Sequence, residues 1–167
     1  MSQKNLFFEG SAHVPLLIMP PQGRSLPHNI SVEAPTDLVD IYPTILAMAG
    51  LSSPVSVSGK NLLEPVPMDR MFFGNSLNKN FCVMEEKVKL VYSAVGDHVL
   101  LFDLNTDPME QHNLAEDPAW QERKAKLWKL LLEHTAQYTP EALDENGQFL
   151  TCLLYTSDAA DDLLCVD

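Results

Sequence analysis

The sequence predicts an α/β fold, made of the end of a mixed-sheet domain followed by a small antiparallel sheet with one packed helix. Three observations lead to this prediction. A short apolar run at 14–19 has the composition of a buried strand. An amphipathic pattern at 36–49 has helical spacing. After residue 70, four strand-like segments come before a second helical pattern that starts at Asp117.

The first part of the chain predicts one strand and one helix. The run at 14–19 ends at two prolines, and its continuous apolar character is typical of a strand covered on both faces. Thr36 can cap the helix, and Gly50 supplies a left-handed stop. Pro43 conflicts with a regular helix, so we expect either a kink there or a helix that begins at Pro43 after a looser turn. The predicted apolar face consists of Leu38, Ile41, Tyr42, Ile45, Leu46 and Ala49.

The second part of the chain predicts an antiparallel meander and a helix. The strand candidates are 71–73, 81–84, 88–92 and 98–102, with short turns between the last three. Asp117 can cap the helix with Pro118 at its first position, and Pro140 ends it. We expect the helix to lie across the sheet on a face formed by Trp120, Leu127, Leu130, Leu131 and His134.

Composition excludes some classes of function. The chain has 167 residues and a formal net charge of -12, which argues against nucleic-acid binding because phosphates require basic surfaces. No apolar run approaches the roughly 20 residues of a membrane helix, so we expect no membrane segment. The sequence does not predict the cellular compartment. The first residues lack a signal peptide, and a periplasmic or secreted parent protein would carry its signal upstream.

The last residues of the chain have the sequence of a cloning or assembly artefact. Residues 152–161 spell CLLYTSDAAD, which resembles the translation of a transposase adapter from sequencing libraries. We therefore interpret 152–167 as adapter-derived, the alternative being a genuine acidic tail. The predicted division is 1–63 for the remnant of an α/β domain, 64–139 for the sheet-plus-helix subdomain, 140–151 for a tail, and 152–167 for the artefact.

Few residues suggest chemistry by themselves. Asp103, Asp107 and Glu110 form an acidic group around a turn, for which a solvated turn is the plain interpretation. A calcium site is the alternative, although the EF-hand spacing and glycine are missing. Cys82 lies in a strand candidate and is expected to be a small buried hydrophobe.

Three segments resemble the sulfatase family of the alkaline phosphatase superfamily. They are KNLFFEGSAHVP at 4–15, PTDLVDIYPTILAMAG at 35–50 and LFDLNTDPMEQHNLA at 101–115. All three stand in the family's order, over roughly residues 4–138. The FFEGSA form of the first segment leans towards bacterial choline-sulfatase-like and arylsulfatase-like members. The resemblance implies that the chain is a C-terminal fragment of such an enzyme.

The resemblance implies one site residue in this chain. The matching lysine, Lys4, would be catalytic by holding the sulfate oxygens, whereas the plain alternative is a solvated terminal lysine. His13 stands where the family usually has arginine, and we expect it to be structural and to hydrogen-bond near Glu9. Cys82 lacks the proline and arginine that accompany the family's nucleophile. No metal ligand of the family has a match in this chain.

The expected function follows from this resemblance. The parent protein would be a metal-dependent hydrolase of a small sulfated substrate, with formylglycine and calcium or a similar divalent cation as cofactors. The isolated fragment would be inactive because the nucleophile and the metal ligands are absent from it. Two alternatives stay open: a phosphodiester or phosphonate ester hydrolase of the same superfamily, and a non-catalytic interaction module.

Overall fold

The computed structural model describes residues 6–19, 31–54 and 56–151. The chain forms two compact units. Unit 1 combines Met1–His13 with Phe73–Asp167, and unit 2 is the intervening Val14–Phe72. Unit 1 is therefore discontinuous in sequence. The division at residue 63 that the sequence suggested concerns the parent fold and stays a prediction.

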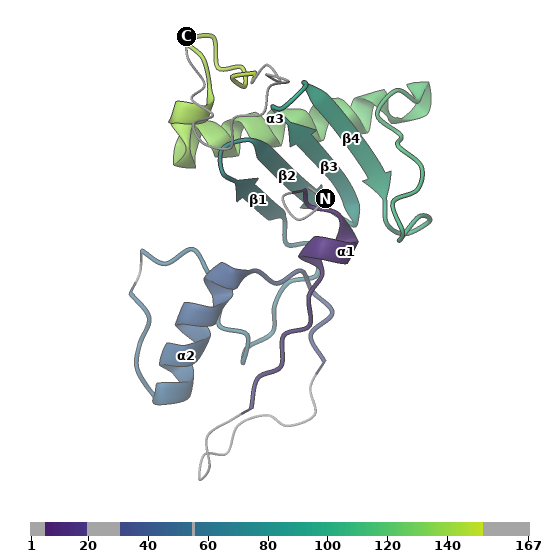
Figure 1. Ribbon diagram of the computed structural model, residues 1–167. Helices are drawn as coiled ribbons and strands as arrows, with labels where there is room; N and C mark the ends of the chain where they lie inside the picture. The colour runs from purple at the N-terminus through teal and green to yellow at the C-terminus, as the bar shows by residue number, and fades with distance from the viewer. Residues whose placement is uncertain (1–5, 20–30, 55, 152–167) are drawn as a thin grey trace, which may run out of the picture. The chain divides into compact units, whose positions relative to one another are not determined.

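A four-stranded antiparallel sheet forms the centre of unit 1 (Figure 1). The strands are β1 (Phe72–Ser76), β2 (Asn80–Glu85), β3 (Val88–Ser93) and β4 (His98–Asp103), in the order β1-β2-β3-β4. This order confirms the predicted meander. Val83 pairs with Leu90, and Leu90 pairs with Leu101, so these three side chains share one face of the sheet.

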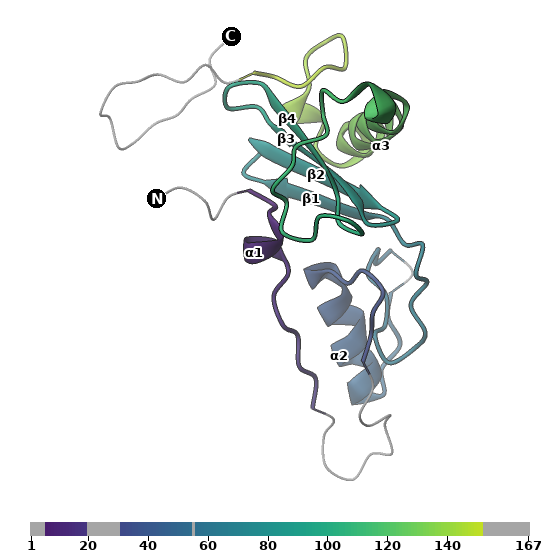
Figure 2. The same cartoon turned by 90° about the vertical axis from the view of Figure 1, so that its right-hand side faces the viewer.

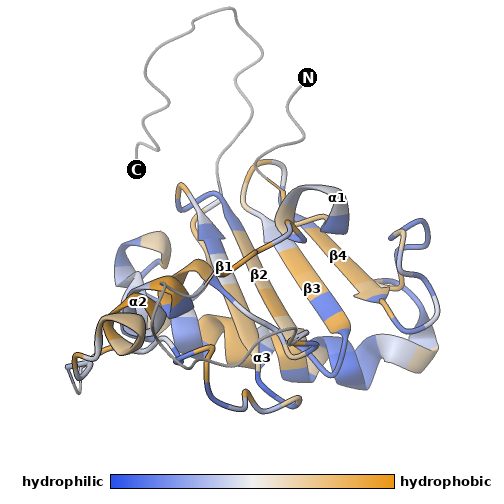
Figure 3. Cartoon of the chain, turned by 90° about the horizontal axis from the view of Figure 1, so that it is seen from below, coloured by the Kyte–Doolittle hydropathy of each residue, from blue (hydrophilic) through white to orange (hydrophobic). Residues whose placement is uncertain are grey.

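Helix α3 (Gln121–Tyr138) covers that face, as predicted. Leu127 and Leu131 are 0% and 1% exposed and lie in one cluster with the apolar side chains of β2, β3 and β4. Figure 3 shows the hydrophobic character of these strands. The helix begins with a 3-10 turn, η3 (Pro118–Trp120), in which the Asp117 side chain accepts a hydrogen bond from the Ala119 N–H at 2.9 Å. This confirms the predicted cap.

The chain after α3 completes the core of unit 1. A 3-10 turn, η4 (Pro140–Ala142), follows the helix, and Leu143 forms an isolated bridge with Phe149. The Phe149 ring is buried and lies 4.5 Å from the Phe81 ring and 4.6 Å from the Tyr92 ring, centroid to centroid. Residues up to 150 thus belong to the packed unit, whereas 152–167 lie outside the described residues.

The opposite face of the sheet holds the start of the chain (Figures 1 and 2). The short helix α1 (Glu9–Ala12) follows Phe8, whose ring centroid lies 6.0 Å from that of Phe102 on β4. A Cβ atom on Gly74 of β1 would come within 2.5 Å of the Phe7 ring, so glycine makes room for this ring. Both faces of the sheet are therefore covered within unit 1.

Unit 2 contains a 3-10 turn, η2 (Leu38–Asp40), that runs directly into α2 (Ile41–Ala49). Asp37, not Thr36, caps this segment. Pro43 falls in the first turn of α2, where the backbone N–H groups have no intrahelical partner, so the proline fits without a kink. Of the two alternatives, the looser turn before the helix is the nearer one, although α2 begins at Ile41 and not at Pro43. Gly50 has φ 75°, which confirms the left-handed stop.

Two predictions for unit 2 are wrong in this chain. Residues 14–19 form no strand, and Leu17 and Met19 are 92% and 87% exposed. A buried strand needs neighbouring strands on its hydrogen-bonding edges, and among the described residues of unit 2 only Phe72, the first residue of β1, belongs to a strand. The predicted apolar face of α2 is also largely exposed, including Tyr42 and Ile45, whereas Thr44 is buried. Among the described residues, no helix is both long and apolar enough to cross a membrane.

Candidate functional site

A buried ionic cluster joins the start of the chain to the sheet of unit 1. Lys89 lies on β3 and points away from α3, and its side chain is only 3% exposed. Its Nζ donates hydrogen bonds to the backbone carbonyl of Phe7 at 2.8 Å and to Glu9 Oε1 at 2.6 Å. A lysine is rarely buried to this extent without partners that compensate its lost hydration.

Glu110 is the third member of the cluster. Its side chain is 4% exposed, and its Oε2 accepts a hydrogen bond from the Glu9 backbone N–H at 2.6 Å. Its Oε1 lies 2.6 Å from Lys89 Nζ. That contact is an ion pair without hydrogen-bond geometry, and Oε1 has no hydrogen bond to any described residue. One buried ammonium therefore faces two carboxylates.

The turn after β4 delivers Glu110 into this cluster. The Asp103 carboxylate accepts hydrogen bonds from Asn105 and Thr106, and Asp107 Oδ2 accepts one from the His112 N–H at 2.8 Å. The hydrogen bond from His112 lowers the pKa of Asp107. The acidic group therefore separates into two carboxylates that shape the turn and one, Glu110, that enters the interior with φ 54°.

His13 lies where we expected it. Its Nδ1 is 3.0 Å from Glu9 Oε2, while its side chain is 80% exposed. The sequence therefore placed Glu9 and His13 together correctly. The sequence did not show that Lys89 and Glu110 are partners of Glu9. The available signal was a lysine in the middle of the apolar run at 88–92, because a strand covered on both faces leaves no solvent for such a residue.

Lys4, the residue predicted to be catalytic, lies outside the described residues. It comes two positions before Leu6, the first described residue. The segment that follows it is the segment held by Lys89 and Glu110.

A second buried ion pair organises unit 2. Asp40 is fully buried, and Arg70 donates to both of its oxygens at 2.6 and 2.9 Å. The backbone N–H groups of Lys60 and Asp37 donate to the same carboxylate at 2.7 and 2.8 Å. Burial acts to raise the pKa of Asp40, but these four hydrogen bonds outweigh it and lower the pKa below its ordinary value.

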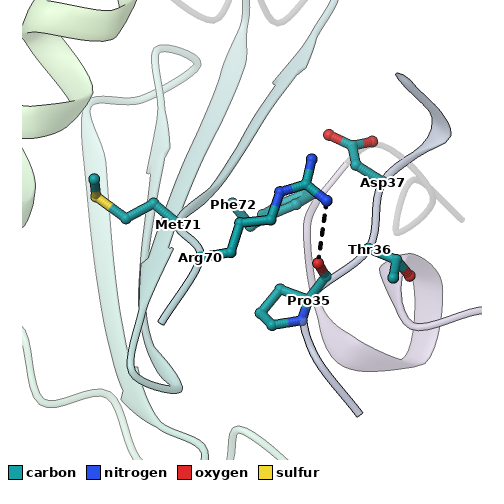
Figure 4. A pocket seen from close by; sticks show the side chains of 6 residues that line it. All are labelled: Pro35, Thr36, Asp37, Arg70, Met71 and Phe72. Carbon is teal, nitrogen blue, oxygen red and sulfur yellow. Dashed lines mark hydrogen bonds between the residues drawn. The ribbon is translucent and has the colours of Figure 1, made fainter. Parts of the chain in front are cut away.

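A small hollow adjoins Arg70 in unit 2 (Figure 4). Arg70 also donates to the backbone carbonyl of Pro35 at 3.3 Å, so its guanidinium is already used within the unit. Burial raises the pKa of the neighbouring Asp37 carboxyl. The arrangement is that of a structural ion pair and not of an anion site. The hollow is lined by Pro35, Thr36, Asp37, Arg70, Met71 and Phe72.

The described residues do not fit the family's cation or nucleophile. No group of three His, Cys, Asp or Glu side chains in the described part of the chain could hold a metal ion. Cys82 is completely buried on β2, and burial raises the pKa of its thiol to about 12, so it carries no thiolate near neutral pH. We therefore derive no catalytic step through a metal or through Cys82.

Comparison with known proteins identifies the family. The family model described as N-sulphoglucosamine sulphohydrolase, C-terminal, matches residues 1–137. The chain belongs to this sulfatase family. The predicted recognition of a sulfatase C-terminal part is confirmed, and so is the α/β fold class.

Individual relatives agree with this assignment. Arylsulfatase K of Bos taurus is 34% identical over 131 residues, covering 67% of this chain and 24% of the relative. Choline-sulfatase of Rhizobium meliloti (strain 1021) is 35% identical over 150 residues, covering 83% of this chain and 28% of the relative. A solved 2-O GAG sulfatase shares the fold with a TM-score of 0.51 at 22% identity, covering 63% of this chain and 26% of that one. The chain spans about a quarter of the length of these proteins.

Proposed function

We propose that the parent protein hydrolyses a sulfate ester and that this chain supplies the C-terminal part of that enzyme. The observation that carries the proposal is the family match over residues 1–137, which includes all three sulfatase-like motifs. Relatives at 33–35% identity are an arylsulfatase and a choline-sulfatase, which favours a small sulfated substrate.

Within this chain, Lys4 is the residue proposed to act on the substrate. An ammonium group stabilises negative charge that develops on the transferring sulfate and on the leaving oxygen. Two observations support this role. Lys4 occupies the lysine position of the first family motif, and segment 6–12, which begins two positions after it, is fixed on the sheet by buried charges.

The nucleophile and the cation belong to the rest of the parent protein under this proposal. Formylglycine and calcium or a similar divalent cation are the cofactors that the family implies, and the described residues of this chain do not form a site for either. The isolated chain is therefore proposed to be inactive, because a single lysine supplies only part of the electrostatic stabilisation.

The test compares three proteins: the whole parent, its Lys4→Ala variant, and the isolated chain. Each is assayed with an aryl sulfate, an aryl phosphonate and a phosphodiester, with and without a chelator. We expect the parent to hydrolyse the sulfate ester fastest, Lys4→Ala to lower kcat/KM, and the isolated chain to show no turnover.

Other outcomes would support the alternatives. A parent that prefers the phosphonate or the phosphodiester would be the other type of hydrolase in the superfamily. A protein without turnover on any of the three substrates would favour an interaction module. Turnover by the isolated chain that survives chelation and is lost in Lys4→Ala would refute the need for the missing part.

A further inference from the structure

The buried cluster in unit 1 holds backbone atoms and not only side chains. Lys89 binds the carbonyl of Phe7, and Glu110 binds the N–H of Glu9. The two contacts fix the chain at two points, two residues apart, on one side of the sheet. A side chain that grips a main-chain group sets the position of that segment regardless of the segment's own side chains.

The segment is also stiffened from within. Ser11 Oγ donates to the backbone carbonyls of Leu6 at 2.6 Å and Phe8 at 3.0 Å. The Phe7 ring occupies the space above Gly74, where any larger residue would collide with it. Segment 6–12 is therefore held by steric fit, by local hydrogen bonds and by the buried charges together.

An ionic cluster is not the arrangement with the lowest free energy for attaching a segment to a sheet. An apolar cluster of similar size is often as stable as a buried ion pair or more so, because each charge loses its hydration. The surplus carboxylate adds to this cost, since Glu110 Oε1 has no hydrogen bond to any described residue. Directional hydrogen bonds to the backbone define the position of the segment on the sheet. Apolar packing specifies that position less well.

We propose that Glu110 and Lys89 are positioning residues that fix the location of Lys4 for catalysis. Lys4 precedes Phe7 by three residues in the sequence, and three residues of chain span at most about 11 Å even when fully extended. Fixing Phe7 and Glu9 therefore restricts the volume that the Lys4 ammonium group can occupy. This inference rests on the function proposed above for Lys4.

The first arm of the test is structural and does not depend on activity. In the whole parent protein, hydrogen exchange is measured for the wild type, Glu110→Ala, Glu110→Gln and Lys89→Met. The matched control is Glu116→Ala, whose side chain is 92% exposed and pairs only at the surface with Lys124. We expect Glu110→Ala to raise exchange in residues 4–12, while β2 to β4 stay protected. Glu110→Gln retains an oxygen that can accept from Glu9, so its effect is smaller.

The second arm is a double-mutant cycle between Lys4→Ala and Glu110→Ala, measured as kcat/KM per correctly folded enzyme. A misplaced catalytic group costs up to about a hundredfold in rate, and we expect Glu110→Ala to cost about tenfold or more when Lys4 is present. When Lys4 is already alanine, the same change should cost less than about twofold. A merely structural role would lower activity equally in both backgrounds.

The outcomes separate the two proposals. Unchanged exchange in residues 4–12 in Glu110→Ala would refute the anchor, whatever the activity. Raised exchange with additive kinetic losses would refute its connection to Lys4. If Lys4→Ala leaves turnover unchanged, the role proposed for Lys4 fails, while the exchange arm still reports on the anchor. If Glu110→Ala does not fold, Glu110→Gln and Lys89→Met give the same comparison.

Discussion

At the scale of single residues, charge burial is concentrated at two points, one in each unit. In unit 2, the Asp40 carboxylate is fully buried and satisfied by Arg70 and by two backbone N–H groups. Removing one partner of such a pair leaves the other buried without compensation. The stability of unit 2 therefore depends on Asp40.

Asp40→Asn should lower the local stability of unit 2 by about 3–5 kcal/mol, because Arg70 loses its partner. The pKa of Asp40 is lowered in the fold, so its stabilising contribution is present above the unfolded value of about 3.9 and is lost as pH falls through the folded value. Amide protection of Lys60 and Leu62, corrected for intrinsic exchange, measures both effects.

The control for this prediction is Asp69→Asn, which changes an exposed carboxylate in the same unit. It should leave the protection of Lys60 and Leu62 unchanged. In Asp40→Asn, the amide protection of Lys60 and Leu62 should be low already at neutral pH. It should therefore not fall further when the pH is lowered. Equal protection in the two variants would show that the Arg70 pair contributes little.

Cys82 should be inert in the folded chain. It is completely buried and burial raises the pKa of its thiol to about 12, so both access and thiolate formation are blocked. Iodoacetamide at pH 8 should leave the peptide containing Cys82 unmodified until denaturant is added, as measured by mass spectrometry. Rapid modification of Cys82 under native conditions would contradict the burial of the sheet's second face.

The sequence predicted one half of the buried cluster and missed the other for a physical reason. Glu9 and His13 are four residues apart, so their contact is local and could be anticipated. Lys89 and Glu110 meet segment 6–12 across separations of 80 and 101 residues. Alternation along β3 shows that Lys89 leaves the α3 face, but nothing local shows that the start of the chain covers the other face.

At the scale of elements, the turn between β2 and β3 contains residue types that are uncommon at its backbone angles. Glu86 and Lys87 have φ 52° and 63°, which is the left-handed region that asparagine and glycine tolerate best. The flanking strands pair in full register up to Glu85 and Val88, so the two-residue turn is enforced by the ladder. The sheet thus imposes a conformation that these two residues disfavour by themselves.

Lys87→Gly should raise the free energy of unfolding by about 0.5–1 kcal/mol, since it relieves the left-handed strain at an exposed position. Urea unfolding followed by tryptophan fluorescence is the measurement, because Trp128 lies in unit 1 beside Tyr92. Lys87→Ala removes the same side chain without relieving the strain and should give no gain. A loss of stability in the glycine variant would show that the turn is not strained.

Elements were predictable where local pattern decides them. The meander and α3 follow from alternation, turn residues and a cap, all of which act over a few residues. The strand expected at 14–19 failed because a strand is completed only by its neighbours. The apolar side of α2 is exposed for the same reason, the absence of a neighbouring element over it among the described residues of unit 2. The sequence pattern shows which side of the helix is apolar, but it does not show what covers that side.

At the scale of the whole molecule, unit 2 leaves much apolar surface open to solvent. Val14, Leu17, Met19, Tyr42 and Ile45 are each more than half exposed. Apolar surface of this extent is unusual for an isolated soluble domain. We expect the isolated chain to self-associate and to show weak amide protection at residues 14–19, as light scattering and hydrogen exchange would reveal. A monodisperse monomer with protected amides at 14–19 would contradict this.

The position at which the folded chain ends can be tested by truncation. Stopping the chain after Leu150 removes the adapter-like residues and should change stability by less than about 1 kcal/mol in a thermal melt. Stopping after Gly147 also removes the buried Phe149 ring and should cost about 3–5 kcal/mol. A large loss on stopping after Leu150 would show that 152–167 belong to the fold.

The discontinuity of unit 1 has a further consequence. Segment 6–12 and the sheet of unit 1 are joined in sequence through unit 2, so in the isolated chain this segment behaves as a tethered peptide ligand of the sheet. The covalent connection through unit 2 keeps that segment at a higher effective concentration near the sheet than it would have as a free peptide. In the isolated chain, a single proteolytic cut between residues 14 and 34, before Asp40 and its partners in unit 2, would turn this intramolecular contact into ordinary bimolecular binding. In the nicked isolated chain, segment 6–12 would then dissociate from the sheet on dilution and expose the Lys89 ammonium group to solvent.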